Sequence, residues 1–348
     1  MIVTYFRSSS YNTHDSCPMS YFIEYGLGWR GASNIKADKG TIVHKVLELM
    51  AVAKEAQQNG QDKFVDEIVG EMSANYYDIN AVCDQVYDYY SKAFSHHKWT
   101  DKDRKDCQNW VWKAITLNNG AFDPRKRKIV KPEIKFDFEI DKPWAQYSYV
   151  LDGEPLVGQL ALKGTIDLVT DISTDGSLYE VVDWKTGRRL NWATGEEKTQ
   201  EKLQNDPQLR MYHYALSHVF PEVKQIMVTI FFINDGGPFS ICFGPDDIAI
   251  TEDMLRKKFE LIKQTKIPRL HKSWKCSKLC SSGKTTFEGT NVTPMKEGRA
   301  GQVTPKGRIM SKCEQTLYTI QTQGIDKVTQ DLKCEGHTIG HYQSPGST

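Results

Sequence analysis

The chain has 348 residues, of which 39% are apolar and 26% are charged, a composition typical of a soluble globular protein with a sizeable core. Its 45 basic and 44 acidic side chains leave a formal charge of +1, so attraction to nucleic acid has to come from local patches. The chain has no apolar run of about 18 residues, so no membrane span is predicted. No secretory signal is recognisable, which favours a cytoplasmic location with reduced cysteines.

The first part of the chain has a mainly helical pattern. Ser8-Ser9-Ser10 offers hydroxyl groups for a helix start. Gly40 precedes a further helix, in which apolar residues recur at helical spacing and His44 lies beside them. We expect an N-terminal segment over 1–60 and a helical region over 61–121.

Near residue 122 the apolar period changes from helical to alternating. Residues 134–140 alternate as in a half-buried strand. Residues 160–170 and 178–184 predict two more strands, and Asp175-Gly176 between them is a turn signal. These two strands are expected to form a hairpin.

A helix over 201–219 and a buried strand over 226–233 follow. The pattern predicts an α/β fold in which a mixed sheet is flanked by helices, with its core over 122–240. A cysteine-bearing segment over 241–320 and a polar tail over 321–348 complete the expected organisation, and we expect the tail to be poorly ordered.

The predicted hairpin carries two acids and a lysine. Asp183 and Lys185 share one face of their strand, the carbonyl of Trp184 lies between them, and Asp167 can approach Asp183 from the neighbouring strand. Carboxylate and carbonyl oxygens are ligands that suit Mg²⁺ or Mn²⁺. The alternative is a solvated strand face, but the apolar residues around the motif favour a buried strand, where an acid and a lysine need partners.

Further polar residues stand on the neighbouring elements. His44 ends the segment Gly40-Thr41-Ile42-Val43-His44, and Gln208 and Tyr212 share one helix face. Glu133 lies on the polar face of the first strand. Each has an ordinary alternative: a core histidine, an amphipathic helix, and a solvent-facing acid.

Taken together, these motifs resemble the RecB-like branch of the PD-(D/E)XK nucleases, in the family's order and across about 40–215. The resemblance implies a restriction-endonuclease-like core. The metal ligands that it implies are His44, Asp167, Asp183 and the Trp184 carbonyl. The catalytic residues that it implies are Lys185, Asp167, Asp183, Gln208, Tyr212 and, as a supporting acid, Glu133.

The activity implied by this resemblance is a Mg²⁺- or Mn²⁺-dependent deoxyribonuclease. It would act as an exonuclease on DNA ends or single strands, with little sequence specificity. A phage or prokaryotic setting in recombination, repair or replication is implied, with a helicase or recombination protein as partner. Two alternatives stay open: a catalytically idle DNA-binding or assembly module, and a CRISPR-linked or RNA-directed nuclease.

Four cysteines add a second expectation. Some RecB-like nucleases, of the AddB type and among CRISPR-associated relatives, hold a [4Fe–4S] cluster on one early and three late cysteines. The residues that correspond to these cluster ligands are Cys17, Cys276, Cys280 and Cys313, with Cys334 as a less favoured fourth ligand. The Cys-x₃-Cys spacing departs from the family's tighter pattern. A cluster, a Zn²⁺ ion and no metal therefore all stay open.

Local basic groups are candidates for phosphate contacts. They are the run 125–128, Arg188-Arg189, and the lysines at 272, 275 and 278. The aromatic side chains of Trp184, Trp192 and Tyr212 are candidates for stacking on unpaired bases. The alternative for each basic run is a solvated surface.

Overall fold

The computed structural model describes residues 1–31, 33–75, 78–151, 154–173, 175–190, 195–292 and 309–328. A π-helical turn over Phe22–Gly26 and short 3₁₀ turns supplement the α-helices. The α-helices are α1 Ser8–Ser16, α2 Pro18–Tyr21, α3 Ile35–Gln58, α4 Ile79–Ala93, α5 Asp101–Gly120, α6 Gln200–Gln204, α7 Pro207–Val219, α8 Asp246–Gln264, α9 Lys275–Lys278, α10 Ser281–Lys284 and α11 Lys312–Gln323.

The strands form one large sheet and two small hairpins. In the large sheet, β1, β7, β8, β9 and β10 follow one another and β4 also pairs with β7. The pairs β2–β3 and β5–β6 form the separate hairpins. The bounds are β1 Tyr5–Phe6, β2 Lys63–Asp66, β3 Gly70–Ser73, β4 Ile129–Glu139, β5 Gln146–Leu151, β6 Glu154–Gln159, β7 Ala161–Asp171, β8 Leu178–Lys185, β9 Gln225–Phe232 and β10 Gly237–Phe243.

Strand β7 has an opening along one of its edges. Strand β4 runs antiparallel to it from Ala161 to Thr170, so β1 and β8 must share the opposite edge. Strand β1 pairs only with Ala161 and Leu162, and the β8 ladder begins at Leu168. Between these two partners the edge of β7 is left open, and Asp167 lies where β8 separates from it.

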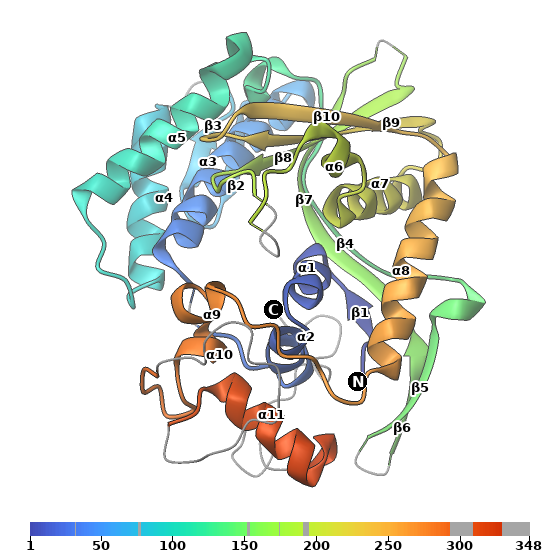
Figure 1. Cartoon of the computed structure of the whole chain (residues 1–348). Coiled ribbons are helices and arrows are strands. Elements are labelled where there is room, and N and C mark those ends of the chain that lie inside the picture. The colour runs from blue at the N-terminus through green and yellow to red at the C-terminus, as the bar shows by residue number, and fades with distance from the viewer. Residues whose placement is uncertain are drawn as a thin grey trace.

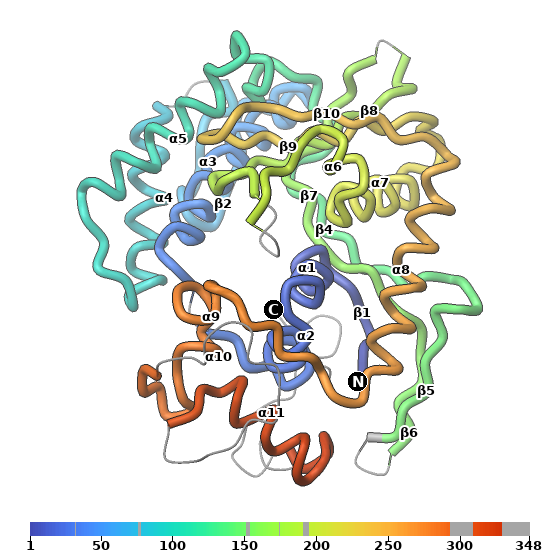
Figure 2. The backbone as a smooth tube through the Cα atoms, in the orientation of Figure 1, coloured from blue at the N-terminus to red at the C-terminus, as the bar shows by residue number. Residues whose placement is uncertain are grey.

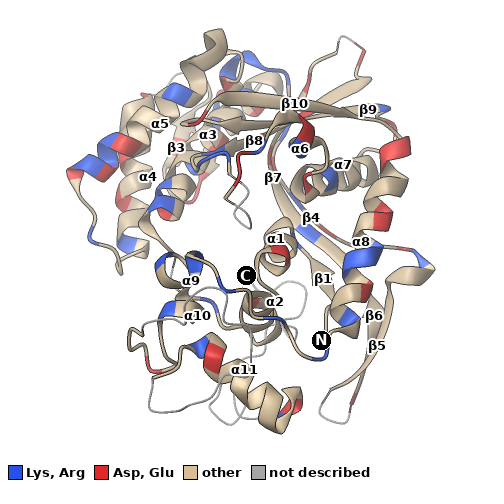
Figure 3. Cartoon of the chain, viewed as in Figure 1, with Lys and Arg blue, Asp and Glu red and all other residues tan. Residues whose placement is uncertain are grey.

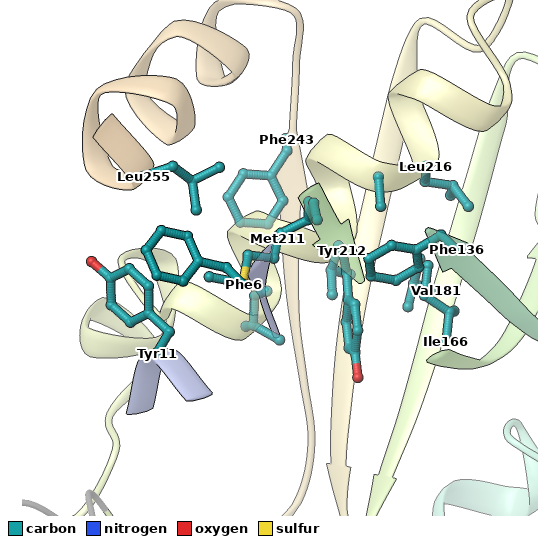
Figure 4. Packing of buried hydrophobic residues seen from close by; sticks show 14 of the residues in the cluster. Phe6, Tyr11, Phe136, Ile166, Val181, Met211, Tyr212, Leu216, Phe243 and Leu255 are labelled. Atoms are coloured by element: carbon teal, nitrogen blue, oxygen red, sulfur yellow. The ribbon is translucent and has the colours of Figure 1, made fainter. Parts of the chain in front are cut away.

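Helices cover both faces of the sheet (Figure 1). On one face, α7, α8 and the N-terminal segment enclose a core that includes Phe6, Val181 and Leu255, and Figure 4 shows part of it. On the other face, α3, α4 and α5 pack over Leu168 and Val182. This three-layer arrangement confirms the predicted α/β fold with a mixed sheet, because β8 is antiparallel to β7 and parallel to β9.

The two ends of the described chain meet in a third apolar cluster. Met19 and Ile23 from the N-terminal segment pack with Leu317 and Ile320 of α11. The tube in Figure 2 shows the blue and the orange-to-red parts of the chain side by side in this region. The expected polar tail begins inside α11, and Val328 beyond that helix is buried, whereas 329–348 lies outside the described residues.

Two local predictions were wrong in detail, and a third region holds more than the predicted helices. Gly40 does not precede its helix but lies inside α3, which begins at Ile35 because the Asn34 side chain accepts hydrogen bonds from the backbone of its first turn. The expected helix over 201–219 is two helices, because Asp206 caps a new helix with Pro207 at its first position. The region 61–121 contains the hairpin β2–β3 beside its helices.

No helix among the described residues is both long and apolar enough to cross a membrane.

Candidate active site

The open edge of β7 gathers most of the predicted site residues. Asp167 comes from β7, Asp183 and Lys185 come from β8, and His44 comes from α3 on one side. Gln208 and Tyr212 lie on α7, on the other side. Continuing the β7–β8 register by one position past Leu168 and Val182 places the two aspartates opposite each other. The predicted hairpin is therefore confirmed, and the described site lies where its two strands begin to separate.

The carboxylate of Asp183 is bonded very unevenly. Its Oδ1 accepts hydrogen bonds from Lys185 Nζ at 2.8 Å, Gln208 Nε2 at 3.1 Å and Tyr212 Oη at 2.9 Å. Its Oδ2 is buried and faces the Lys185 ammonium, whose Nζ lies 2.6 Å away, and no other donor among the described residues. One oxygen is thus held firmly while the other keeps lone pairs available.

Both apolar packing and hydrogen bonds hold the Tyr212 side chain in place. Its ring lies in the apolar cluster beneath the sheet, and its hydroxyl points out of that cluster (Figure 4). Gln208 Nε2 also donates to this hydroxyl at 2.7 Å, as the one-turn separation along α7 allows. Gln208 and Tyr212 therefore contact Asp183 directly and hold the orientation of its carboxylate.

Asp167 joins the other half of the site. Its Oδ2 lies 3.3 Å from His44 Nδ1 and accepts a hydrogen bond from the backbone N–H of Trp184 at 3.0 Å. The indole of Trp184 is 1% exposed and packs in the core under α3. The backbone of Trp184 is therefore part of the site through its N–H, whereas ligation by its carbonyl stays a prediction.

The two aspartates have opposite electrostatic surroundings. Burial raises the pKa of Asp183; Lys185 offsets part of this rise, and the negative charge of Asp167 adds to it. Burial also acts to raise the pKa of Asp167, but His44, Lys185 and the Trp184 N–H together outweigh it and the pKa is lowered overall. A buried carboxylate with a raised pKa beside an ionised one is a pair that a divalent cation would stabilise.

The remaining two ionisable groups of the site, Lys185 and His44, both have raised pKa values. Burial alone would lower the pKa of Lys185, but Asp183 and Asp167 raise it overall. Burial also acts to lower the pKa of His44, and Asp167 again reverses the direction. In this arrangement the Lys185 ammonium faces the site as a fixed positive charge.

Close packing explains why the Gly-x-x-x-His segment begins with a glycine. A Cβ atom at Gly40 would lie 2.9 Å from Oγ1 of Thr186, the residue that follows Lys185. Only a residue without a side chain lets α3 approach the end of β8 this closely. That close approach brings His44, one helical turn later, towards the aspartates.

Glu133 lies beside this group in the neighbouring strand. In the β4–β7 ladder it falls between the pairs Pro132–Leu168 and Ile134–Ile166, and its φ of 40° is unusual for a residue with a side chain. Its carboxyl group hydrogen-bonds to Glu48, and burial together with this bond raises the pKa of Glu48 to about 7.

The sequence reasoning missed Glu48 and its partners. Lys45 Nζ lies 2.8 Å from both Glu48 and Asp66, so one lysine joins an acid of α3 to the β2–β3 hairpin. The available signal was helical spacing, because Glu48 follows His44 by four residues and so shares its face.

The protein-family comparison matches the model of the PD-(D/E)XK nuclease superfamily to residues 8–282, most of the chain. The matched segment contains α3, α7 and every strand of the large sheet except β1, and hence all the site residues described above. The chain belongs to the PD-(D/E)XK nuclease superfamily. As a PD-(D/E)XK protein it belongs among nucleases, which hydrolyse phosphodiester bonds with divalent metal ions.

The four predicted cysteines of this PD-(D/E)XK protein lie around the junction of its two ends. The Cys280 and Cys313 thiols are hydrogen-bonded to each other, which lowers the pKa of Cys280 to about 6 and raises that of Cys313. The backbone of His271 contacts both remaining sulfurs, at 3.5 Å for Cys17 and 3.7 Å for Cys276. Cys334 lies outside the described residues.

These sulfurs do not form a compact site. A tetrahedral Zn²⁺ site would bring its thiolates within about 4 Å of one another. Among the described residues, the one group of three or more ligand atoms within 4.8 Å contains no cysteine. An assembled zinc or iron–sulfur site is therefore not seen at these cysteines.

Several of the predicted DNA-binding basic residues form ion pairs within the fold. Arg125 pairs with Asp123, Arg127 with the buried Glu180, and Lys128 with Asp171. The ion pair with a buried acid makes Arg127 a structural residue, whereas Arg125 and Lys128 are exposed and their contact with DNA stays a prediction.

The other basic groups divide between fold and surface. Arg189 pairs with Glu197 and lies over the Phe239 ring, and Lys272 pairs with the buried Glu314. Arg188, next to the site strand, is exposed. Lys275 and Lys278 belong to α9, which carries blue segments in Figure 3. Trp192 lies outside the described residues.

Proposed function

We propose that this protein is a Mg²⁺- or Mn²⁺-dependent deoxyribonuclease of the RecB-like branch, acting as an exonuclease on DNA ends or single strands. The observation that carries the proposal is the unequal bonding of Asp183. Three donors hold Oδ1, and the buried Oδ2 faces only the Lys185 ammonium, which it shares with a second carboxylate, Asp167. Two buried carboxylates this close favour a divalent cation between them.

The side chains fit such a cation. His44, Asp167, Asp183 and the carbonyl of Trp184 are the ligands that we assign, a set of hard oxygen donors with one imidazole. When bound, a divalent ion supplies Lewis-acid polarisation at the phosphate and a lower pKa for an attacking water.

The protein's own groups then have separable tasks. The Lys185 ammonium, held positive by the two aspartates, would orient the attacking water and stabilise negative charge that develops on the phosphate. Gln208 and Tyr212 hold Asp183 Oδ1, and so fix where Oδ2 points. Glu133 and Glu48, a carboxyl pair that shares a hydrogen bond, would support the edge of the site next to Asp167.

The proposed substrate is DNA with little sequence specificity. Among the predicted basic groups, the exposed Arg188 next to the site strand and Lys278 on α9 are best placed for phosphate contacts. We further propose that the cysteines hold a structural [4Fe–4S] cluster that joins the two ends of the chain. The support for this is that the four cysteines lie at the junction of the two ends, where Cys280, Cys17 and Cys276 all act to raise the pKa of Cys313. Recombination, repair or replication is the setting that suits this activity.

The test is digestion of DNA labelled at either the 5′ or the 3′ end, single- and double-stranded, with Mg²⁺, Mn²⁺ or EDTA. We expect cleavage with Mg²⁺ or Mn²⁺, none with EDTA, and resistance of closed circular duplex DNA. Lys185→Ala should abolish cleavage while DNA binding persists. Lys163→Ala is the matched control, because Lys163 lies on β7 and pairs with Asp137.

The outcomes separate the alternatives. Binding without metal-dependent cleavage would identify an idle DNA-binding module, and cleavage of RNA but not DNA would identify an RNA-directed nuclease. Rapid cutting of circular DNA would exclude the exonuclease mode. For the cysteines, anaerobically purified protein should show iron–sulfur absorbance that Cys280→Ala removes, and a colourless, iron-free protein would contradict the cluster.

A further inference from the structure

We propose that Asp38, His96 and His97 form a second metal site, which takes a divalent transition-metal cation of the Zn²⁺ type. The proposal does not depend on the nuclease assignment. Asp38 lies in the first turn of α3, and the two histidines lie in the connection between α4 and α5. Residues far apart in the sequence thus meet where the helical layer begins.

The ligand atoms converge on one point. Asp38 Oδ2 lies 2.6 Å from His97 Nε2 and 3.9 Å from His96 Nε2. One ligand atom from each of the three residues lies within 4.8 Å of the other two. Ligands around tetrahedral zinc are about 3.4 Å apart. A cation therefore requires only side-chain shifts of the order of 1 Å.

The charge balance also points to a cation. The Asp38 side chain is 4% exposed, and in the described chain its ion-pair partners are only these two histidines. Its neighbour Lys39 is held by Asp103 and Asp106 of α5 instead. The two imidazole rings are 4.0 Å apart, so two protonated rings would repel each other, whereas two neutral rings can both act as ligands.

The donor types select the class of metal. Two imidazole nitrogens and one carboxylate are ligands that suit Zn²⁺ and related transition metals, whereas Mg²⁺ prefers oxygen donors. Ser33 can supply a further oxygen, because its hydroxyl donates to Asp38 Oδ2 at 2.7 Å and its carbonyl lies 3.4 Å from His96 Nε2. His96 is 41% exposed, which gives an ion a route in from solvent.

A cation at this position would fasten the α4–α5 connection to the start of α3. Asp38 precedes His44 by six residues on the same helix, a distance of about 9 Å along its axis. The site is thus separate from the proposed active site, and its expected effect is on the stability of the helical layer.

The test is Zn²⁺ titration of the chelator-extracted full chain, with excess Mg²⁺ present to occupy the active site. Calorimetry counts the tight equivalents, and thermal unfolding is followed on the same samples. The variants are His96→Ala/His97→Ala and Asp38→Asn, which keeps the shape of the carboxylate. The matched control is His218→Ala, an exposed histidine on α7. All four proteins keep every cysteine, so zinc bound by thiolates is common to them.

We expect both variants to bind one tight equivalent fewer than the wild type, with an affinity loss above about 100-fold at that site. Zn²⁺ should raise the Tm of the wild type and of His218→Ala by about 4 °C more than that of the variants. Equal stoichiometry and affinity in all four proteins would overturn the proposal, as would wild-type binding only at millimolar Zn²⁺. If the double variant does not fold, Asp38→Asn alone decides.

Discussion

Strand β8 carries two buried acids whose charges are compensated differently. Glu180 receives the Arg127 guanidinium and the Thr229 hydroxyl, the latter at 2.5 Å, so each of its oxygens has a partner. Asp183, three residues later, has the Lys185 ammonium beside both of its oxygens but lies opposite a second carboxylate, Asp167, which shares that charge. Burial alone therefore does not mark a functional acid. A buried acid whose charge is incompletely compensated does mark a functional site, because the fold alone gives no reason to retain it.

The same contrast explains the basic residues. Arg127 belongs to the sequence run that most resembles a nucleic-acid patch, yet it completes the partners of Glu180 and also donates to Thr170. Lys185 stands in a mainly apolar strand, yet its ammonium faces the proposed site. Whether a basic side chain of this chain is structural or available to a ligand therefore depends on the acid that it faces.

The largest expected effect is from Asp183→Asn. Cleavage should fall by at least about 10³-fold, because a charged ligand is lost. The Tm should stay equal or rise, since the substitution removes a buried charge whose pKa burial and Asp167 raise. Steady-state cleavage assays and thermal unfolding measure the two effects. Retained cleavage would remove Asp183 from the site, and a large fall in Tm would make it a structural acid like Glu180.

The converse substitution is Arg127→Met. It leaves Glu180 buried without its cation and should cost about 3–5 kcal/mol of unfolding free energy. The folded fraction should keep its cleavage rate, because Arg127 does not contact the site residues. Urea unfolding with activity corrected for the folded fraction measures this. Normal stability with lost activity would reverse the comparison and return Arg127 to substrate binding.

The Glu48–Glu133 pair should give the stability a pH dependence. The pKa of Glu48 is raised from 4.5 to about 7 in the fold. A raised carboxyl pKa stabilises the folded state fully below the unfolded pKa, and this contribution disappears as the pH rises through 7. Wild-type stability should therefore fall by about 3 kcal/mol between pH 4.5 and 8 on this account, and Glu48→Gln should flatten the profile.

Glu133→Gln provides the check on this pair, because it removes the neighbour whose hydrogen bond helps to raise the pKa of Glu48. It should flatten the profile in the same direction. Denaturant unfolding across this pH range is the measurement. Two unchanged profiles would show that the carboxyl groups do not share a proton.

The smallest expected effect is from Tyr212→Phe. One of three hydrogen bonds to Asp183 Oδ1 is lost, which should cost about 1 kcal/mol of stability. Cleavage should fall by about 10-fold through kcat with KM retained, since Tyr212 holds a ligand in place. The matched control is Tyr214→Phe, which lies on the same helix as Tyr212 and removes a hydrogen bond to Glu252 of α8. Equal effects of the two substitutions would assign Tyr212 to packing alone.

Periodicity and motif spacing anticipated the centre of the molecule. The strand-like segments over 160–170 and 178–184 and the turn signal between them predicted β7 and β8, and the four-residue spacing of Gln208 and Tyr212 predicted their common face on α7. These are local properties, set by the pitch of a strand or a helix. Whether a given acid, arginine or histidine has a partner is not local, so the structural role of Arg127 was not foreseen and Glu48 and Asp38 were missed.

The sequence by itself determined the hairpin, the types of side chain on it and the family resemblance, because these follow from residue order and local geometry. Only the tertiary structure decided which charges are compensated. Residues tens of positions apart meet in the ion pairs of Arg127 and Lys39, in the hydrogen bonds that Asp183 accepts from α7, and in the group of Asp38, His96 and His97. The physical reason is that compensation of a buried charge depends on contact distances within a few ångströms, which folding sets and sequence spacing does not.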